Sequence, residues 1–270
     1  MKLLFLGDIV GRAGRSVVAE RVPDLRRKLG IDLVIANGEN VAHGFGITAK
    51  TAAELYEAGI DVITTGNHVW DQREALTYIE RDDRLLRPVN FPAGTPGRGT
   101  TLVQVAGGRS VLVINVMGRV FMDPLDDPFA AVARELEICP LRTGADVVVI
   151  DIHAEATSEK MAMGHFADGR ASLVVGTHSH VPTADAQILP GGTAYQTDAG
   201  ACADYDSIIG MDKHEPLQRF TRKYGEGRFT PAEGPATLCG LYLETDARTG
   251  LAVRVEPVRV GGRLSEAIPG

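Results

Sequence analysis

The 270-residue sequence contains few cysteines, no long apolar run and no excess of positive charge. Its three cysteines are widely spaced and form no CxxC pair, which argues against a zinc ribbon and a disulfide framework. No apolar stretch reaches the roughly 18 to 20 residues that a membrane span requires. The net charge of -7 argues against general electrostatic binding of duplex nucleic acid. We therefore expect neither a membrane nor duplex nucleic acid as a partner.

The N-terminal stretch MKLLFLGDIVG has one lysine and a short apolar core, as a signal peptide does. Its apolar run stops at Asp8, however, and no small-residue cleavage pattern follows. We interpret the stretch as a first core strand. Isolated cysteines in apolar surroundings are typical of buried thiols in a reducing compartment. Both features predict a cytoplasmic protein.

Short runs rich in valine, isoleucine and leucine alternate with helical segments through the first two thirds of the chain. Helical spacing of apolar residues, with caps and glycines at the ends, predicts helices over 14–30, 48–59, 71–82 and 128–144. This alternation indicates an α/β fold built from βαβ units. The last part of the chain predicts short strands that complete a second sheet, with a loop and one short helix over 211–230. We expect a single domain over residues 1–270.

Several of the apolar runs end in the same few polar residue types. Ligands of open α/β sheets bind beyond the carboxyl ends of the strands, so we expect these side chains to converge. They are Asp8, Glu39, Asn40, Asn67, His68, His153, His178 and His180. Carboxylates, amides and imidazoles suit manganese, iron or zinc. Eight such groups exceed the needs of one ion, and two ions bridged by a carboxylate would use them all.

Single residues of this kind also have simpler explanations. An aspartate after a strand is often a turn former or helix cap, and one histidine at a strand end is more often a surface or packing residue. The pair in HSH is a stronger signal, because His178 and His180 point to the same side of an extended chain. His43 lies in a glycine-rich loop, where a substrate-side role and a plain loop role are equally supported. For His165 and His214 a surface or packing role is favoured.

The ordered motifs GD, GNH, a later histidine and GTHSH resemble those of the calcineurin-like metallophosphoesterase superfamily. The usual first motif GDxHG reads GDIVG here, with Val10 at the histidine position, and the usual second motif GDxxD is replaced by NGEN. Together with DIHAEATSEK and GTHSHVPTAD, these departures resemble the YmdB-like branch, whose members have about this length. The resemblance covers essentially the whole chain.

The resemblance implies a four-layer αββα sandwich with the metal site at the C-terminal strand ends. It also implies a dinuclear phosphodiesterase, often an iron enzyme, that hydrolyses 2',3'-cyclic nucleotides and, as a further class, 3',5'-cyclic ones. His68 would protonate the leaving oxygen. Asn40 would replace the histidine that is missing at Val10. The implied ligand sets are Asp8, Glu39, Asn40 and His180 for one ion, and Glu39, Asn67, His153 and His178 for the other, with Glu39 as the bridge.

Two cations would polarise the phosphoryl oxygens and lower the pKa of a water between them, so that a bridging hydroxide attacks phosphorus. Two other functions stay open at this point. One is a regulatory protein that senses a nucleotide with little turnover, and the other is a dinuclear hydrolase of another ester or amide. The retained His68 favours catalysis, because a sensor needs no proton donor. The sequence does not distinguish between a monomer and a homo-oligomer, nor among loops 41–47, 117–129 and 199–230 as substrate contacts.

Overall fold

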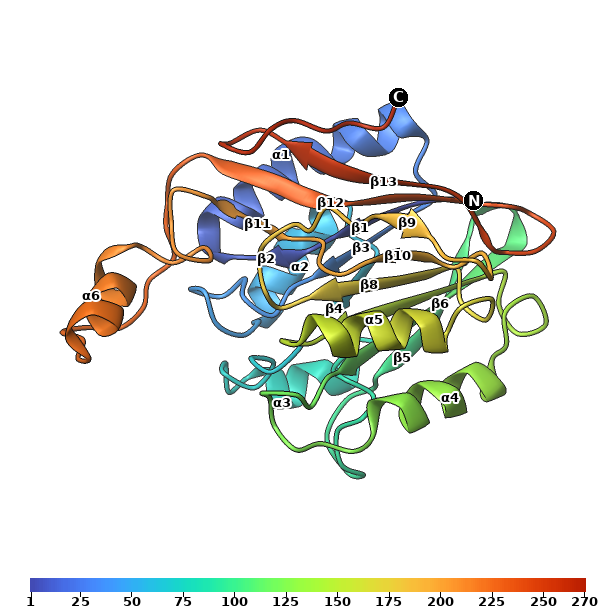
Figure 1. Cartoon of the computed structure of the whole chain (residues 1–270), viewed down its shortest axis with the longest axis horizontal. Coiled ribbons are helices and arrows are strands. Elements are labelled where there is room, and N and C mark those ends of the chain that lie inside the picture. Colours follow the sequence, from blue (N-terminus) through green and yellow to red (C-terminus); the bar gives the residue numbers. More distant parts are fainter.

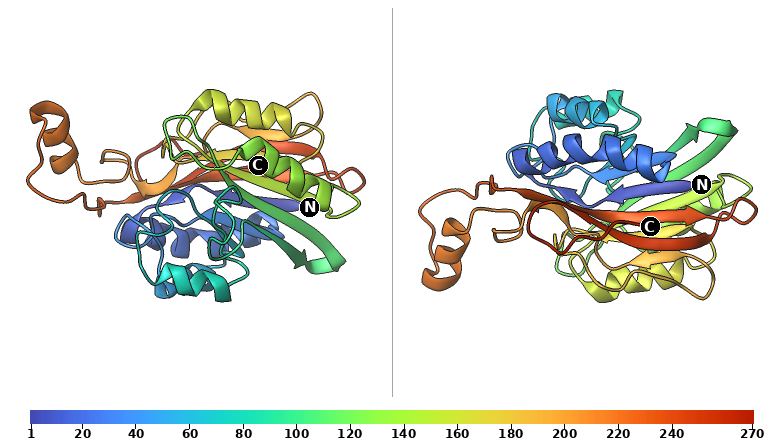
Figure 2. Two further views of the ribbon diagram at one scale, coloured as in Figure 1. Left: turned by 90° about the horizontal axis from the view of Figure 1, so that it is seen from below. Right: turned by 90° about the horizontal axis from the view of Figure 1, so that it is seen from above.

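Two β-sheets lie face to face between two layers of helices in the computed structural model, which describes residues 1–270 (Figure 1). Both views in Figure 2 show α1 (Gly11–Leu29) and α2 (Ala49–Glu57) on one outer side, and α4 (Pro128–Ile138) and α5 (Thr157–Phe166) on the other. The αββα order of layers confirms the predicted sandwich.

The first sheet has seven strands in the order β2-β11-β12-β1-β3-β4, with β13 paired to β12. The strands β1, β3 and β4 are parallel, because α1 and α2 form the crossovers between them. The strand bounds are β1 Lys2–Leu6, β2 Asp8–Ile9, β3 Leu33–Asn37, β4 Val62–Thr64, β11 Ala201–Asp204, β12 Ala236–Thr245 and β13 Ala252–Val260.

The second sheet has six strands in the order β5-β6-β7-β8-β10-β9. Its four central strands are parallel and its two edge strands are antiparallel to their neighbours. The strand bounds are β5 Thr100–Val105, β6 Arg109–Met117, β7 Val147–His153, β8 Leu173–Thr177, β9 Gln187–Ile188 and β10 Ala194–Gln196. The C-terminal strands β11 to β13 complete the first sheet, whereas β9 and β10 complete the second.

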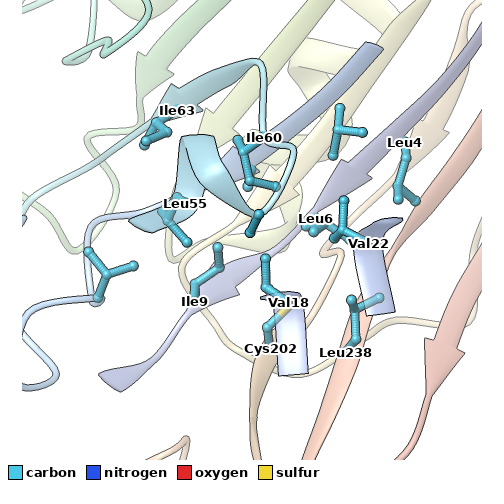
Figure 3. Close-up of a cluster of buried hydrophobic side chains, with 14 of the residues drawn as sticks. Leu4, Leu6, Ile9, Val18, Val22, Leu55, Ile60, Ile63, Cys202 and Leu238 are labelled. Atoms are coloured by element: carbon cyan, nitrogen blue, oxygen red, sulfur yellow. The ribbon is translucent and has the colours of Figure 1, made fainter. Parts of the chain in front are cut away.

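The strand β1 is buried on both faces, and its side chains alternate between two hydrophobic cores. Leu3 and Phe5 belong to the cluster that joins the two sheets. Leu4 and Leu6 belong to the cluster beneath α1 and α2, where Leu6 lies near Val22 of α1 (Figure 3). This period of two on doubly covered strands explains why the strands read as continuous apolar runs.

Two of the four predicted helices are shorter than the sequence pattern indicates. The segment 71–82 forms only α3 (Ala75–Tyr78) and the 3-10 turn η1 (Ile79–Arg81), because Asp71 and Gln72 bind a neighbouring histidine and the carbonyl of Phe45. The helix predicted over 128–144 ends at Ile138, ahead of Pro140. The other two match the prediction closely: α1 begins at Gly11 and stops at Gly30, and α2 has a capping box at Thr48. A second 3-10 turn, η2 (Ala106–Gly108), links β5 and β6.

Residues 207–232, called the arm below, connect β11 to β12 and stand away from the body of the molecule (orange in Figures 1 and 2). The arm carries one short helix, α6 (His214–Arg222), as the sequence predicts. Elsewhere, Cys202 and Cys239 are buried free thiols and Cys139 is partly exposed. None of the helices combines the length and the apolar composition needed to cross a membrane.

Candidate metal centre and active site

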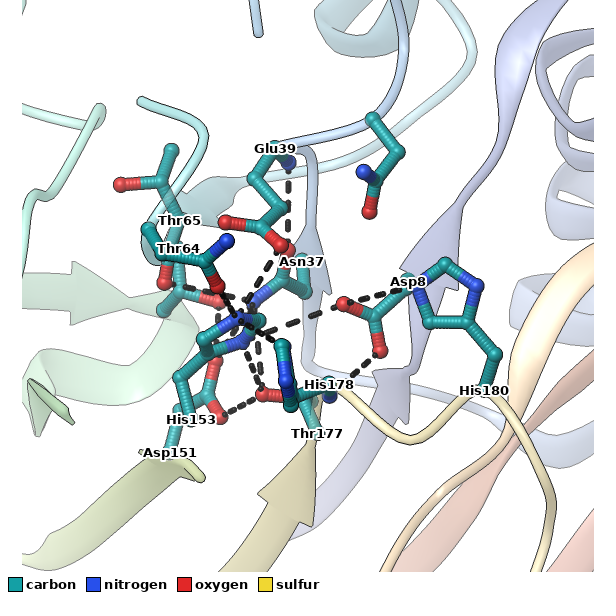
Figure 4. Close-up of polar contacts among 12 residues, drawn as sticks. Asp8, Asn37, Glu39, Thr64, Thr65, Asp151, His153, Thr177, His178 and His180 are labelled. Atoms are coloured by element: carbon teal, nitrogen blue, oxygen red, sulfur yellow. Dashed lines mark hydrogen bonds and ion pairs between the residues drawn. The ribbon is translucent and has the colours of Figure 1, made fainter. Parts of the chain in front are cut away.

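The eight side chains predicted to converge lie at the ends of five strands that belong to both sheets. They are Asp8 at the start of β2, Glu39 and Asn40 after β3, Asn67 and His68 after β4, His153 at the end of β7, and His178 and His180 after β8. Figure 4 shows His153 and His178 on one side of the cluster and Asp8 with His180 on the other. Both sheets therefore present polar groups to the same end of the sandwich.

His153 is fully buried. Its outer nitrogen, meaning the ring nitrogen that points away from the cluster, is Nδ1, and a chain of hydrogen bonds holds it; the inner nitrogen, which points into the cluster, is Nε2. Its Nδ1 lies 2.9 Å from the hydroxyl oxygen of Thr177, and that hydroxyl donates to Asp151 at 2.7 Å. Because the threonine proton goes to the carboxylate, Thr177 accepts from Nδ1–H of His153. The lone pair of Nε2 then faces the cluster, which is the tautomer that a metal ligand requires.

Two of the other three histidines of the cluster, His178 and His180, are oriented in the same way. His178 places Nε2 at 3.2 Å from the carboxylate of Glu155. His180 donates from Nδ1 to the carbonyl oxygen of Ile209 at 2.8 Å. Each histidine thus has its outer nitrogen on an acceptor, and each inner nitrogen presents a lone pair to the cluster.

Three further potential metal-ligand atoms lie at nearly equal distances from Nε2 of His153. Oδ1 of Asn67 and Oε1 of Glu39 each lie 3.0 Å away, and Nδ1 of His178 lies 3.1 Å away. Oε1 of Glu39 makes no hydrogen bond despite this short distance. Donors about 2.1 Å from a shared ion and at right angles to one another lie about 3.0 Å apart. The spacing fits four ligands of one cation.

Three buried oxygens of the cluster have no hydrogen-bond partner: Oδ1 of Asp8, Oε1 of Glu39 and Oδ1 of Asn40. An unpaired buried carboxylate oxygen is costly unless a cation or a proton offsets its charge. Nε2 of His180 lies 3.8 Å from Oδ1 of Asp8, so an imidazole is available beside these oxygens. The donor set therefore fits bound metal, with oxygen and nitrogen ligands on both sides of Glu39.

The electrostatics of the cluster also favour positive charge at its centre. Burial opposes ionisation of Glu39, but the attraction of His153 outweighs it and lowers the pKa of Glu39 to about 2. Burial likewise opposes protonation of His153, but Glu39, Asp8 and Asp151 raise its pKa to about 9. For His178, burial and the neighbouring His153 lower the pKa to about 3, which keeps this ring neutral.

Asn40 and Val10 have different environments. Nδ2 of Asn40 donates to the carbonyl of Gly44 at 3.0 Å, which leaves Oδ1 as the atom without a partner. Val10 is buried in a small apolar cluster with Ala203 and Met211. The residue at the position of the usual histidine therefore packs against the base of the arm, whereas the amide of Asn40 belongs to the polar cluster.

His68 lies at the edge of the cluster and is 30% exposed at its side chain. Its backbone N–H donates to Oε2 of Glu39 at 3.0 Å, and its Nδ1 lies 2.8 Å from the carboxylate of Asp71. Phe45 packs edge-on against the ring, with centroids 5.0 Å apart. These contacts fix the imidazole with Nε2 as its free nitrogen.

The expectation that His178 and His180 lie on an extended chain is wrong. The strand β8 ends at Thr177, and both histidines have positive φ angles, 92° and 63°. Asp198 causes this bend, since its carboxylate accepts from the backbone N–H and the hydroxyl of Ser179. Lys160 pairs with the same carboxylate at 2.7 Å, and both partners are fully buried. The two imidazoles reach the cluster through this turn.

Sequence reasoning missed the residues that hold the donors in place. Asp151 accepts hydrogen bonds from Asn37, Thr64 and Thr177 beneath His153, and burial raises its pKa to about 6. The threonines at the ends of β4 and β8 were the available signal, because polar residues ending apolar strands need a partner. Lys160 could also have been noticed, because it is a lysine on the buried side of α5.

A cavity of about 510 Å³ opens above the cluster. Its walls include Glu39, Asn40, His68, His178 and His180, together with Phe45 and residues of the arm. Of the three loops left open as substrate contacts, 41–47 and 199–230 line this cavity and 117–129 does not. His43 lines a neighbouring cavity of about 700 Å³, which shares Phe45 and Phe229 with the first.

Comparison with known proteins agrees with this geometry. Residues 4–258 match the family described as YmdB-like protein. The 2',3'-cyclic-nucleotide 2'-phosphodiesterase of Bacillus subtilis is 48% identical over 260 residues, which cover 96% of this chain and 97% of that protein. A hypothetical protein from Thermus thermophilus has a crystal structure that matches with a TM-score of 0.90 and 44% identity, over 97% of this chain and 100% of the other.

The crystal structure of a phosphatase from Mycoplasma pneumoniae matches with a TM-score of 0.89 and 34% identity, over 97% of this chain and 93% of the other. Of these relatives, the Bacillus subtilis protein is named as a phosphodiesterase and the Mycoplasma pneumoniae protein as a phosphatase, and both crystal structures share the fold of this chain. The chain therefore belongs to the YmdB-like family, with the calcineurin-like metallophosphoesterase fold, and is a metal-dependent phosphoric ester hydrolase.

Proposed function

We propose that this enzyme is a dinuclear phosphodiesterase that hydrolyses 2',3'-cyclic nucleotides, with 3',5'-cyclic nucleotides as a second class to be tested. The observation that carries the proposal is the set of three buried oxygens without hydrogen-bond partners beside three imidazoles whose outer nitrogens are held by acceptors and whose inner nitrogens face the cluster. The Bacillus subtilis relative, named for its action on 2',3'-cyclic nucleotides, supports the substrate class.

Glu39 is the proposed bridge between two metal ions. Asp8, Asn40 and His180 would complete one ligand set, and Asn67, His153 and His178 the other. The short, unaligned contact between Glu39 and His153 supports the second set, and the orphaned oxygens of Asp8 and Asn40 support the first. We expect iron, with manganese or zinc as alternatives, because oxygen and imidazole donors suit all three. When bound, the ions supply Lewis acidity and a water of lowered pKa that serves as the nucleophile.

Asn40 is proposed to replace the histidine of the usual first motif. Its carbonyl oxygen is buried without a partner, and the hydrogen bond from its amide to Gly44 leaves the side chain one orientation. Val10 cannot ligate a metal and packs among apolar residues instead. A neutral amide in this position leaves the ligand set less negative than a further carboxylate would.

His68 is the proposed general acid for the leaving oxygen. The imidazole borders the cavity, and Asp71 accepts from Nδ1–H, so Nε2 is the ring nitrogen left for contact with the substrate. Its backbone hydrogen bond to Glu39 ties its position to the proposed bridge. Proton transfer from Nε2 to the ester oxygen would then accompany cleavage of the P–O bond.

The decisive experiment combines elemental analysis with steady-state kinetics on a panel of esters. We expect two metal ions per chain and turnover of 2',3'-cyclic nucleotides. One ion per chain with full activity would contradict the bridging role of Glu39. Tight nucleotide binding without product would favour a nucleotide sensor, and turnover of carboxylic esters or amides alone would favour another hydrolase. The single domain, the cytoplasmic location and the oligomeric state stay predictions or open questions that this experiment does not address.

A further inference from the structure

The cavity above the donor cluster has two chemically different ends. One end presents the carboxylate, amide and imidazole groups described above. The rest of the lining is apolar and includes Phe45, Ile209, Met211, Pro216, Phe220 and Phe229. Its volume of about 510 Å³ falls within the range of small-molecule sites, roughly 300–1,000 Å³. A ligand that fills it must be anionic at one end and apolar at the other.

Most of the apolar end comes from the arm, whose aromatic side chain Phe220 is 79% exposed. Phe220 is not needed to hold α6, because polar contacts already do so. Glu215 pairs with Arg219 and accepts from the backbone N–H groups of Glu226 and Gly227. Arg219 in turn lies 4.2 Å from the ring centre of Phe229. Phe220 therefore offers an aromatic face that no other part of the chain covers.

The base of the apolar wall is tied to the donor cluster by a hydrogen bond. The carbonyl of Ile209 accepts the Nδ1 proton of His180 at 2.8 Å. Ile209 has a φ of 47°, which is rare for a β-branched residue and is retained here in the turn that makes this contact. The turn at Ile209 thus orients His180, a proposed metal ligand, and is also the first part of the apolar segment that leads to α6.

We propose that the arm is the nucleobase-binding wall of the active site, with Phe220 as the residue on which the base stacks. The inference rests on the proposed function, since it takes the phosphate of a cyclic nucleotide to lie at the donor cluster. The base is the one part of such a substrate with a π face, and the ribose is polar. Stacking on an aromatic side chain contributes about 1–3 kcal/mol per base, whichever base is present.

The chemistry of the wall predicts which bases are accepted. Phenylalanine, isoleucine, methionine and proline side chains carry no conventional hydrogen-bond donor, and the cavity places none beside Phe220 apart from the histidines and the amide at the donor end. Without directed hydrogen bonds, discrimination between bases follows the stacking area alone. We expect purine cyclic nucleotides to exceed pyrimidine ones by no more than about tenfold in kcat/KM.

The test compares two substrates that differ only in the base: 2',3'-cyclic AMP and 1-O-methylribose 2,3-cyclic phosphate. In the metal-loaded enzyme, Phe220→Ala should raise KM for the nucleotide about 10-fold or more and leave kcat/KM for the base-free sugar unchanged. Phe220→Trp should retain nucleotide KM, whereas Phe220→Leu, which keeps bulk but lacks the π face, should resemble Phe220→Ala. Calorimetric titration with adenosine 3'-phosphate should show the same order of Kd values.

The matched control is Leu217→Ala, which removes an exposed apolar side chain from the same helix but outside the cavity. This variant should behave as the wild type on both substrates. Equal loss on both substrates, or no loss with Phe220→Ala, would overturn the role of the arm while the proposed function stands. Failure of the wild-type enzyme to hydrolyse either substrate would instead overturn the proposed function.

Discussion

The donor cluster and the arm line the same cavity, but they differ in how deeply their side chains are buried and in what holds those side chains in place. In the cluster, five of the eight residues are buried and the other three are partly exposed, and the outer nitrogens of His153, His178 and His180 each lie on an acceptor. In the arm, Phe220 is largely exposed and the hydrogen bonds of α6 run mostly within the arm itself. The candidate metal ligands thus lie mostly in the core, whereas the arm is attached at the surface.

This difference separates two kinds of substitution. Ordered donors inside a core act on every substrate, because they define where the phosphoryl group and its nucleophile lie. An exposed segment with few contacts to the core has low local stability and tolerates change. Substitutions in the cluster should therefore reduce turnover of all phosphodiesters, and substitutions in the arm should change only the preference among them.

The largest effect is expected for Glu39→Gln, which removes the charge of the proposed bridge and keeps its size. Turnover of every phosphodiester should fall on the order of 10³-fold, and the metal content should fall with it. Metal analysis and kcat on two unrelated esters check this. Glu20→Gln on the exposed face of α1 is the matched control. Normal metal content with full activity would remove Glu39 from the centre of the site.

The next largest effect is expected on stability, when the buried pair of Lys160 and Asp198 is broken. Lys160→Met leaves a buried carboxylate without its counter-ion and should lower the free energy of unfolding by about 3–5 kcal/mol. Urea denaturation measures this loss.

A double variant separates the two roles of this pair. Lys160→Met with Asp198→Leu should regain much of the stability, because no charge is then left unpaired. Its activity should stay low, since Ser179 has lost the acceptor that bends the chain between the two histidines. A double variant with wild-type turnover would show that this turn does not need Asp198.

His68→Ala should keep the metal and lose about 10²-fold in kcat on a cyclic nucleotide, whose leaving alkoxide needs a proton. The loss should be smaller on a p-nitrophenyl phosphodiester, because p-nitrophenolate leaves without protonation. Comparing kcat for the two esters checks the role of the imidazole. An equal loss on both would assign His68 to binding or folding instead of proton transfer.

The smallest effect in this series is expected for Asp71→Asn. A hydrogen bond to a charged group contributes about 1.5–3 kcal/mol, and the amide retains part of it, so kcat should fall about tenfold. The effect of Asp71→Asn on the activation free energy should add to the effects of substitutions in the arm, but it should not add to the effect of His68→Ala. Full additivity with His68→Ala would mean that the aspartate does not act through the imidazole.

The convergence of the strand-end residues within each sheet was predictable because parallel strands end at one edge, whereas the meeting of Asp8 with His153 also depends on how the two sheets stack. The layer order followed from the family motifs, and the continuous apolar runs showed strands covered on both faces. The contacts between distant segments were not predictable. Lys160 and Asp198 are 38 positions apart, and nothing local in the sequence pairs them. The bend at Ser179 depends on that pair, which is why an extended HSH segment was the wrong expectation.

The arm was harder to interpret for a different reason. Periodicity predicts a short helix near 214–222, but the direction in which that helix points depends on the turn at Ile209 and its contact with His180. Similarly, the shortening of the helix predicted over 71–82 depends on Gln72 reaching Phe45 across the cavity rim. Tertiary contacts of single side chains overrode local propensity at both places.

The donors come from β2, β3 and β4 of one sheet and from β7 and β8 of the other, so any cation they share is a crosslink between the halves of the sandwich. Most of the interior between the sheets is apolar, and the directional contacts across it include the hydrogen bonds that Asp151 of β7 accepts from Asn37 of β3 and Thr64 of β4. Ligand bonds to the proposed metal ions would add links between the two sheets, and binding to the folded state alone would add to stability by mass action. The proposed metal centre would then act on the alignment of the two sheets as well as on the chemistry.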